Sequence, residues 1–256
     1  MITDNAIIAF ECLHAIQNSS SAQTNFCAYK LDLSKAYGRV DCAFVEKAFL
    51  KLGFHSIRVR WIMSCVSSVC FSICFNGVLT DSFAPTRGLR QGDPLSPYLF
   101  LFAADALSMT LQQEIESSNL EELKITRAAP GISHLLFTDD ALLFFKANAD
   151  QARRVKEVIR SFELGTGQLL SPTKCSLLAR ESVSPEVKQE ICNILGTAKV
   201  QFEAKNLGLP TPDGRQKQER FQPLKERFAK RMNAWTEKHL SSAGKEVRIK
   251  LFQLTS

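Results

Sequence analysis

The stretch His134-Leu135-Leu136-Phe137-Thr138-Asp139-Asp140-Ala141-Leu142-Leu143-Phe144-Phe145 places two adjacent carboxylates between two short apolar runs. Two such runs joined by polar residues are typical of a β-hairpin whose strands pack into a core. The acid pair would then lie at the edge of a sheet, where close carboxylates repel one another unless a cation joins them. Taken alone, the pair favours a polar hairpin turn, because Asp is a common turn residue.

A second acid, Asp32, ends another apolar run, Ala28-Tyr29-Lys30-Leu31. An acid at the end of a buried strand is a candidate third ligand for a metal ion. Hard divalent ions such as Mg²⁺ bind oxygen, and often take only one or two protein carboxylates beside phosphate and water. Considered by itself, Asp32 fits a helix cap or a surface acid better.

A third segment, Arg87-Gly88-Leu89-Arg90-Gln91-Gly92-Asp93-Pro94-Leu95-Ser96-Pro97, is more specific. Its two glycines permit the backbone to approach a ligand closely, and Arg90 and Gln91 offer hydrogen-bond donors. The helix expected to begin at Asp93-Pro94 adds a positive dipole end suited to phosphate. An ordinary loop that leads into a capped helix explains the segment equally well.

Hydrophobic periodicity predicts the remaining elements. The expected helices are 5–16, 43–52, 57–65, 93–111, 149–164, 185–195 and a basic one at 217–240; the expected strands are 26–33, 134–137 and 141–145, with a hairpin of 70–75 and 78–83 around Asn76-Gly77. Helices interspersed with strands and two hairpins indicate an α+β fold with a partly antiparallel sheet.

Composition limits the function classes. Of the 256 residues, 45% are hydrophobic and 23% are charged, which excludes a disordered or low-complexity chain. No apolar stretch reaches the roughly 18–20 residues of a membrane span, and the start of the chain lacks the basic region of a secretory signal. We therefore expect an intracellular protein of the nucleus or cytoplasm, not secreted and without a membrane partner. The net charge of +6 lies wholly in residues 201–256, with 12 Lys/Arg against 6 Asp/Glu, and hints at a polyanionic partner.

In their order, these motifs resemble the reverse transcriptases of non-LTR, LINE-type retrotransposons, most closely those of plants. The shared pieces are Ile2-Thr3-Asp4-Asn5, Lys30-Leu31-Asp32-Leu33-Ser34-Lys35-Ala36-Tyr37, Gly88 to Pro97, His134 to Asp140, Leu207-Gly208-Leu209-Pro210 and Ala243-Gly244-Lys245-Glu246-Val247. The resemblance implies a polymerase palm, with a ferredoxin-like sheet packed on helices. It implies a reverse transcriptase domain over 1–212 and the start of a thumb over 213–256, where a basic helix begins.

The resemblance also implies a catalytic set. Asp32 and Asp139 would bind two Mg²⁺ ions and Asp140 would complete the acidic triad, for transfer of a nucleotide to a primer 3′-hydroxyl. Lys174 lies where the family's lysine protonates the leaving pyrophosphate.

The implied partners are an RNA template, a DNA primer and deoxynucleoside triphosphates. Tyr37 occupies the family's steric-gate position, which favours deoxynucleotides over ribonucleotides. The remaining implied binding residues are Arg90, Gln91 and Gly92 at the nucleotide and template; Leu207, Gly208 and Leu209 in the primer grip; and Lys225, Arg227, Lys230 and Arg231 along the nucleic-acid backbone.

The chain departs from the family pattern in several places. Gly38 stands where a second acid is usual, Thr138 replaces an alanine, and Asn206 replaces an aromatic residue. Against the family's pattern, we expect this chain to lack most of the fingers and most of the thumb. We therefore expect a polymerase that is weak or inactive by itself.

Three alternatives stay open beside the RNA-directed DNA polymerase. A non-catalytic retrotransposon relic would at most bind nucleic acid, and a maturase-type reverse transcriptase of group II introns would need a further domain after the thumb. A metal-dependent hydrolase would need a base beside the metals. The nearest histidine, His134, is predicted to lie on the opposite strand face from Phe137, as a packed strand residue with one hydrogen bond.

Overall fold

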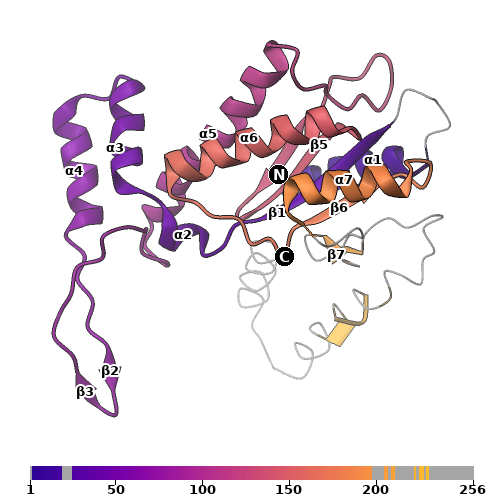
Figure 1. The fold of residues 1–256 in the computed structure, drawn as a ribbon. Helices are drawn as coiled ribbons and strands as arrows, with labels where there is room; N and C mark the ends of the chain where they lie inside the picture. The colour runs from indigo at the N-terminus through magenta and orange to yellow at the C-terminus, as the bar shows by residue number, and fades with distance from the viewer. Residues whose placement is uncertain are drawn as a thin grey trace, which may run out of the picture.

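The computed structural model describes residues 2–18 and 25–197, together with 205–206, 209–210, 222, 225–227 and 229–230. At its centre is a four-stranded sheet in the order β4-β5-β1-β6 (Figure 1). The strands are β1 (Phe26–Asp32), β4 (His134–Phe137), β5 (Asp140–Lys146) and β6 (Ser176–Ala179). All three strand pairings are antiparallel.

The connections between these strands give the sheet its ferredoxin-like topology. Helix α5 (Ser96–Glu116) lies in the chain between β1 and β4, and α6 (Ala149–Thr166) joins β5 to β6. Strands β1 and β4 therefore run in the same direction with β5 inserted between them, which is a split β-α-β arrangement. The predicted α+β class and ferredoxin-like sheet are confirmed, and the sheet is antiparallel throughout.

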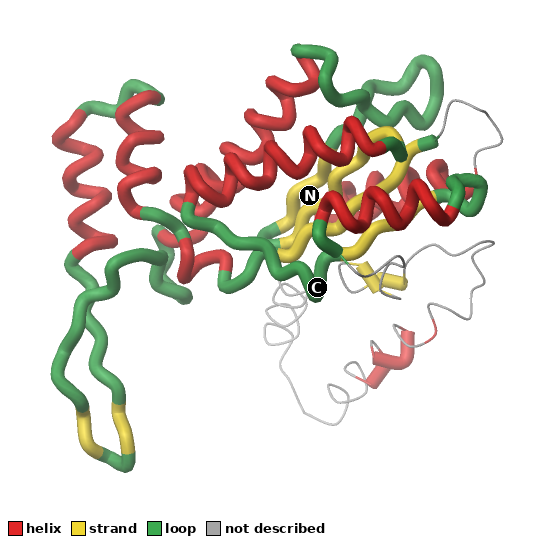
Figure 2. Tube along the Cα trace, in the orientation of Figure 1, coloured by secondary structure: helices red, strands yellow, loops and turns green. Residues whose placement is uncertain are grey.

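Helices cover both faces of the sheet, which explains why its central strands are apolar at nearly every position. In β1, Cys27, Tyr29 and Leu31 are buried against α5, α6 and α7 (Pro185–Leu195). Ala28, on the opposite face, packs against α1 (Ile2–Asn18). The Asn5 side-chain amide of α1 also donates to the Leu136 carbonyl at 2.8 Å. The core is thus a helix–sheet–helix sandwich (Figure 2).

A second group of helices extends from one end of the sheet. We call it the helical lobe: α2 (Ala36–Arg39), α3 (Cys42–Lys51), α4 (Ser56–Ser67) and the first half of α5, which share one buried cluster (Figure 1). A hairpin of β2 (Cys74–Phe75) and β3 (Val78–Leu79) projects beyond it. Both turn residues, Asn76 and Gly77, have positive φ, as the predicted two-residue turn requires.

Some predicted boundaries were wrong. Helix α5 begins at Ser96 rather than at Asp93-Pro94, because Asp93 forms a separate turn: its Oδ1 accepts from the Leu95 amide at 2.8 Å and its carbonyl accepts from the Ser96 amide at 3.2 Å. Strand β6 and the single-turn helix α2 were not predicted.

The C-terminal part of the chain is described only in pieces. Strands β7 (Lys205–Asn206) and β8 (Leu209–Pro210) form an antiparallel pair. Most of the helix predicted over 217–240 lies outside the described residues, although 222, 225–227 and 229–230 are helical. No helix in the described part of the chain is both long and apolar enough to span a bilayer.

Candidate active site

Strand pairing brings the three predicted acids to one edge of the sheet. Asp32 and Asp140 are direct register partners in the β1–β5 ladder, and Asp139 immediately precedes Asp140. The Leu33 amide donates to the Asp139 carbonyl at 3.1 Å, which extends the ladder past the strand ends. Two segments more than one hundred residues apart in sequence therefore present their carboxylates side by side.

The turn that carries Asp139 is conformationally strained. Phe137 pairs with Asp140, so Thr138 and Asp139 are the two central residues of the β4–β5 hairpin. Thr138 has φ 49°, a left-handed conformation that β-branched residues rarely adopt. Its hydroxyl donates to Asp139 Oδ1 at 2.8 Å and so orients that exposed carboxylate. The threonine that departs from the family pattern is thus in direct contact with an acid of the site.

Two lysines offset part of the negative charge of the three acids. The Lys174 ammonium donates to both oxygens of Asp32, at 3.2 and 3.4 Å. On the face covered by α1, the Lys30 ammonium lies 3.9 Å from Asp140 Oδ2 and is buried, with only 9% of the residue exposed. Lys174 therefore pairs with Asp32 at the end of β1, and Lys30 pairs with Asp140 at the start of β5.

Burial and neighbouring charges shift the pKa values of Asp140 and Lys174. Burial raises the pKa of Asp140; Lys30 opposes this shift, while the negative charges of Asp139 and Asp32 add to it. The pKa of Lys174 is raised, first by its hydrogen bond to Asp32 and then by the negative charge of the acids. The acids therefore form a negatively charged edge that stabilises cations.

The donor chemistry of this edge fits a hard divalent ion. Its candidate ligands are carboxylate oxygens, the donors that Mg²⁺ prefers. The Lys174 ammonium already lies against both oxygens of Asp32, so this carboxylate pairs with a positive charge in the structure. Within the described residues, however, no three His, Cys, Asp or Glu side chains are gathered closely enough to form a complete ligand cluster.

Tyr37 is held at the start of the helical lobe. Its ring stacks on that of the buried Phe100 in α5, with centroids 4.9 Å apart and 17° between the planes. The Leu89 amide donates to the Tyr37 carbonyl at 2.7 Å. Tyr37 is thereby joined to the loop that contains Arg90, Gln91 and Gly92.

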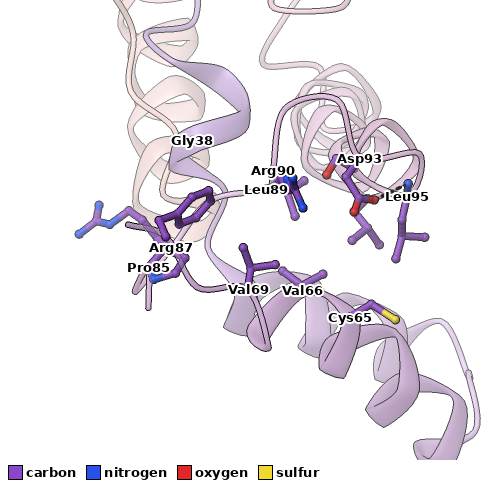
Figure 3. Close-up of a pocket in the computed structure, with 14 residues that line it drawn as sticks. Gly38, Cys65, Val66, Val69, Pro85, Arg87, Leu89, Arg90, Asp93 and Leu95 are labelled. Carbon is purple, nitrogen blue, oxygen red and sulfur yellow. Dashed lines mark hydrogen bonds between the residues drawn. The ribbon is translucent and has the colours of Figure 1, made fainter. Parts of the chain in front are cut away.

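That loop forms one wall of a cavity of about 170 Å³. Figure 3 shows Leu89 and Arg90 opposite Val66 and Val69, which belong to the end of α4 and the residues after it. Arg90, Gln91 and Gly92 are all exposed, so their donors are open to solvent. Among the residues that the structure describes, no hydrogen bond or ion pair joins Arg90, Gln91 or Gly92 to the acids.

The predicted nucleic-acid residues are described only in part. Lys225, Arg227 and Lys230 are helical and exposed. Leu209 begins β8, whereas Leu207, Gly208 and Arg231 lie outside the described residues.

Sequence reasoning missed Lys30 and Gln168. Lys30 is the polar residue two positions before Asp32 in an apolar strand, which places it on the same face of the sheet and was a readable signal. Gln168 is 2% exposed, and its side-chain amide donates to the Ala36 carbonyl at 2.9 Å. No local sequence pattern predicts this contact between residues far apart in the chain.

Comparison with known proteins identifies the fold family. The profile of the family described as reverse transcriptase (RNA-dependent DNA polymerase) matches residues 2–209, most of the chain. The chain belongs to the reverse transcriptase family. Its α+β sheet is accordingly a polymerase palm, and the acidic edge lies within the matched part of this reverse transcriptase domain.

The similar proteins point to non-LTR retrotransposons. The reverse transcriptase domain is 29% identical over 154 residues to a retrovirus-related Pol polyprotein from the type-1 retrotransposable element R2 of Popillia japonica, covering 60% of this chain and 24% of that protein. It is 45% identical over 65 residues to an uncharacterized mitochondrial protein of Arabidopsis thaliana, covering 25% of this chain and 53% of that protein. The resemblance to reverse transcriptases of non-LTR retrotransposons is thus confirmed, and the chain spans about half or less of these relatives.

Among solved structures, the domain resembles a telomerase from Candida tropicalis in complex with a fragment of telomeric RNA. The two are 16% identical, with a TM-score of 0.47, over 89% of this chain and 36% of that chain.

Proposed function

We propose that this domain performs RNA-directed DNA synthesis, with Asp32, Asp139 and Asp140 as the acids that hold two Mg²⁺ ions. The observation that carries the proposal is the register of β1 with β5, which sets Asp32 opposite Asp140 with Asp139 beside it. Divalent-ion chemistry is general in the family; the choice of Mg²⁺ rests on the all-oxygen donor set.

Each residue of the site then has a task. Two bound ions would supply activation of the primer 3′-hydroxyl and stabilisation of charge on the pyrophosphate. Asp32 and Asp139 provide the ligands, and the Thr138 hydroxyl orients Asp139. The Lys174 ammonium is the proton donor for the departing pyrophosphate. Asp140, which pairs with buried Lys30, completes the acidic triad.

The remaining residues bind the substrates. Tyr37, fixed against Phe100, excludes a ribose 2′-hydroxyl and so favours deoxynucleoside triphosphates. In this proposal residues 1–212 form the reverse transcriptase domain and 213–256 start the thumb. The proposed contacts to nucleotide and template are Arg90, Gln91 and Gly92; those to the primer are Leu207, Gly208 and Leu209; and those to the backbone of the RNA–DNA hybrid are Lys225, Arg227, Lys230 and Arg231.

Primer extension tests the proposal. The purified chain is given a DNA primer on an RNA template, the four deoxynucleotides and Mg²⁺, and the extended primer is measured. We expect weak extension that is lost in Asp139→Asn. The matched control is Asp150→Asn, which removes an exposed acid of α6 paired with Arg153, and should extend like the wild type.

The second candidate is a binding relic, which would use the same exposed Lys225, Arg227 and Lys230 as the polymerase but only to bind nucleic acid. Such a protein would bind RNA with an affinity that falls steeply with salt. Salt-sensitive binding without any extension above the Asp139→Asn background would favour the relic over the polymerase.

A further inference from the structure

The turn that follows α6 is hydrogen-bonded to the end of β1. The Ser171 amide donates to the Asp32 carbonyl at 2.9 Å, and the amides of Lys174 and Cys175 donate to the Ser171 carbonyl at 2.9 and 3.1 Å. The turn therefore fixes the backbone of Lys174 close to the Asp32 carboxylate.

The two partners of this ion pair are held very differently. The Asp32 side chain is 18% exposed and is anchored in the β1–β5 ladder, whereas the Lys174 side chain is 64% exposed. A long, exposed lysine can swing away while its backbone stays in place. The carboxylate has no such freedom, so Lys174 is the partner that can leave.

The ammonium also occupies the oxygens that a divalent ion would need. Both Asp32 oxygens lie 3.2–3.4 Å from Lys174 Nζ. An ion that took the lone pairs now facing Lys174 Nζ, at the usual Mg²⁺–oxygen distance of about 2.1 Å, would bring two cations into contact. Lys174 and the ion therefore compete for Asp32.

We propose that Lys174 is a built-in competitor of the divalent ion: it neutralises Asp32 in the metal-free domain and is displaced when the ion binds. The inference rests on the proposed metal site and adds a regulatory step to it. Displacement frees the ammonium on the same side of the sheet edge, where it can act as the proton donor. Without metal the acidic edge thus has one fewer uncompensated carboxylate, and its metal affinity is lower than its acids alone would give.

Metal affinity tests the inference without reference to activity. Mn²⁺ binding to the full chain is measured by electron paramagnetic resonance. Lys174→Met removes an exposed ion pair, so this variant should bind Mn²⁺ roughly twofold to fivefold more tightly than the wild type. Lys174→Arg keeps the cation and should bind like the wild type. Lys47→Met removes an equal charge from α3 in the helical lobe and should also bind like the wild type.

Displacement itself has a direct readout. Lysines of the chain are dimethylated with ¹³C, and the signal missing from Lys174→Arg is assigned to Lys174. We expect this signal to move on addition of Mg²⁺ in the wild type and to stay fixed in Asp139→Asn.

Two contrary results can be told apart. If Mn²⁺ binds to the wild type and is lost in Asp139→Asn, yet Lys174→Met binds no more tightly, the competitor role is wrong and the metal site stands. If the folded wild type and Lys174→Met both bind no Mn²⁺, the metal site fails and the inference fails with it.

Discussion

At the scale of single residues, two glycines allow the chain to pack closely against the backbone of helix α2, which follows the Asp32 strand. Gly88 has φ +94°, and a Cβ there would lie 2.7 Å from the Gly38 carbonyl oxygen. Gly167 has φ +77°, and a Cβ there would lie 2.6 Å from the Arg39 carbonyl oxygen. The sequence predicted that the Gly88 backbone approaches a ligand closely, whereas in the structure it closely approaches helix α2. Long-range contacts of this kind leave no local signature.

Substitution of Gly88 separates this contact from simple backbone strain. Gly88→Ala should lower the free energy of unfolding by about 2–4 kcal/mol, because it adds a collision to the cost of a left-handed residue. Gly92→Ala is the matched control: it lies in the same loop with φ +87° but open space around it, and should cost about 1–2 kcal/mol. Urea denaturation measures both. Equal losses would show that the contact with Gly38 contributes nothing.

At the scale of elements, β4 is fastened to α5 through His134. The Ser108 hydroxyl lies 2.7 Å from His134 Nε2, and the Ser133 hydroxyl lies 2.8 Å from Nδ1. His134 is therefore a packed strand residue as predicted, with two hydrogen bonds rather than one. Its contact with α5 places it on the face opposite α1, whereas Phe137 lines a small space beside Asn5 of α1.

Burial of His134 makes the stability of the fold depend on pH. Burial lowers the pKa of His134 below its ordinary value of 6.5, so the unfolded chain binds the proton more readily than the folded chain. The stabilisation is complete above about pH 6.5 and is lost as pH falls through the lowered pKa. Wild type should lose more stability than His134→Gln between about pH 7.5 and about pH 5.5 in urea titrations. Parallel curves for the two proteins would refute this coupling.

The strands that carry the acids could be predicted from sequence because β1 and β5 are mostly apolar. Helices α6 and α7 could be predicted because their apolar residues recur at helical spacing. Strand β6 has only four residues and begins with Ser176, and α2 is one turn containing Gly38, so neither has a recognisable period. The pairing of Lys174 with Asp32 depends on how the turn after α6 meets the sheet, which the family resemblance did not imply.

At the scale of the whole molecule, helix α5 joins the helical lobe to the sheet. Leu99, near its start, is buried in the cluster of the lobe, and Leu107, about two turns later, is buried in the cluster beneath the sheet. One rigid helix therefore contributes to both cores. We infer that the lobe and the sheet unfold together, which keeps Tyr37 fixed relative to Asp32.

Truncation in either core tests this coupling. Leu99→Ala and Leu107→Ala should each cost about 2–5 kcal/mol, because both side chains are almost fully buried. Hydrogen exchange by mass spectrometry should then accelerate in peptides from α4 and from β1 in both variants. Faster exchange confined to α3 and α4 in Leu99→Ala would mean that the lobe opens independently.

Iron-directed cleavage tests most directly whether the acids from the two strands share one ion site. Fe²⁺ replaces Mg²⁺ on the folded chain, and ascorbate with peroxide then cuts the backbone next to the bound metal. We predict cuts around Asp32 and around Asp139 in the same sample, suppressed by excess Mg²⁺ and absent from Asp139→Asn. Cuts at only one of these two segments, or at neither, in a chain that remains folded would contradict a shared site.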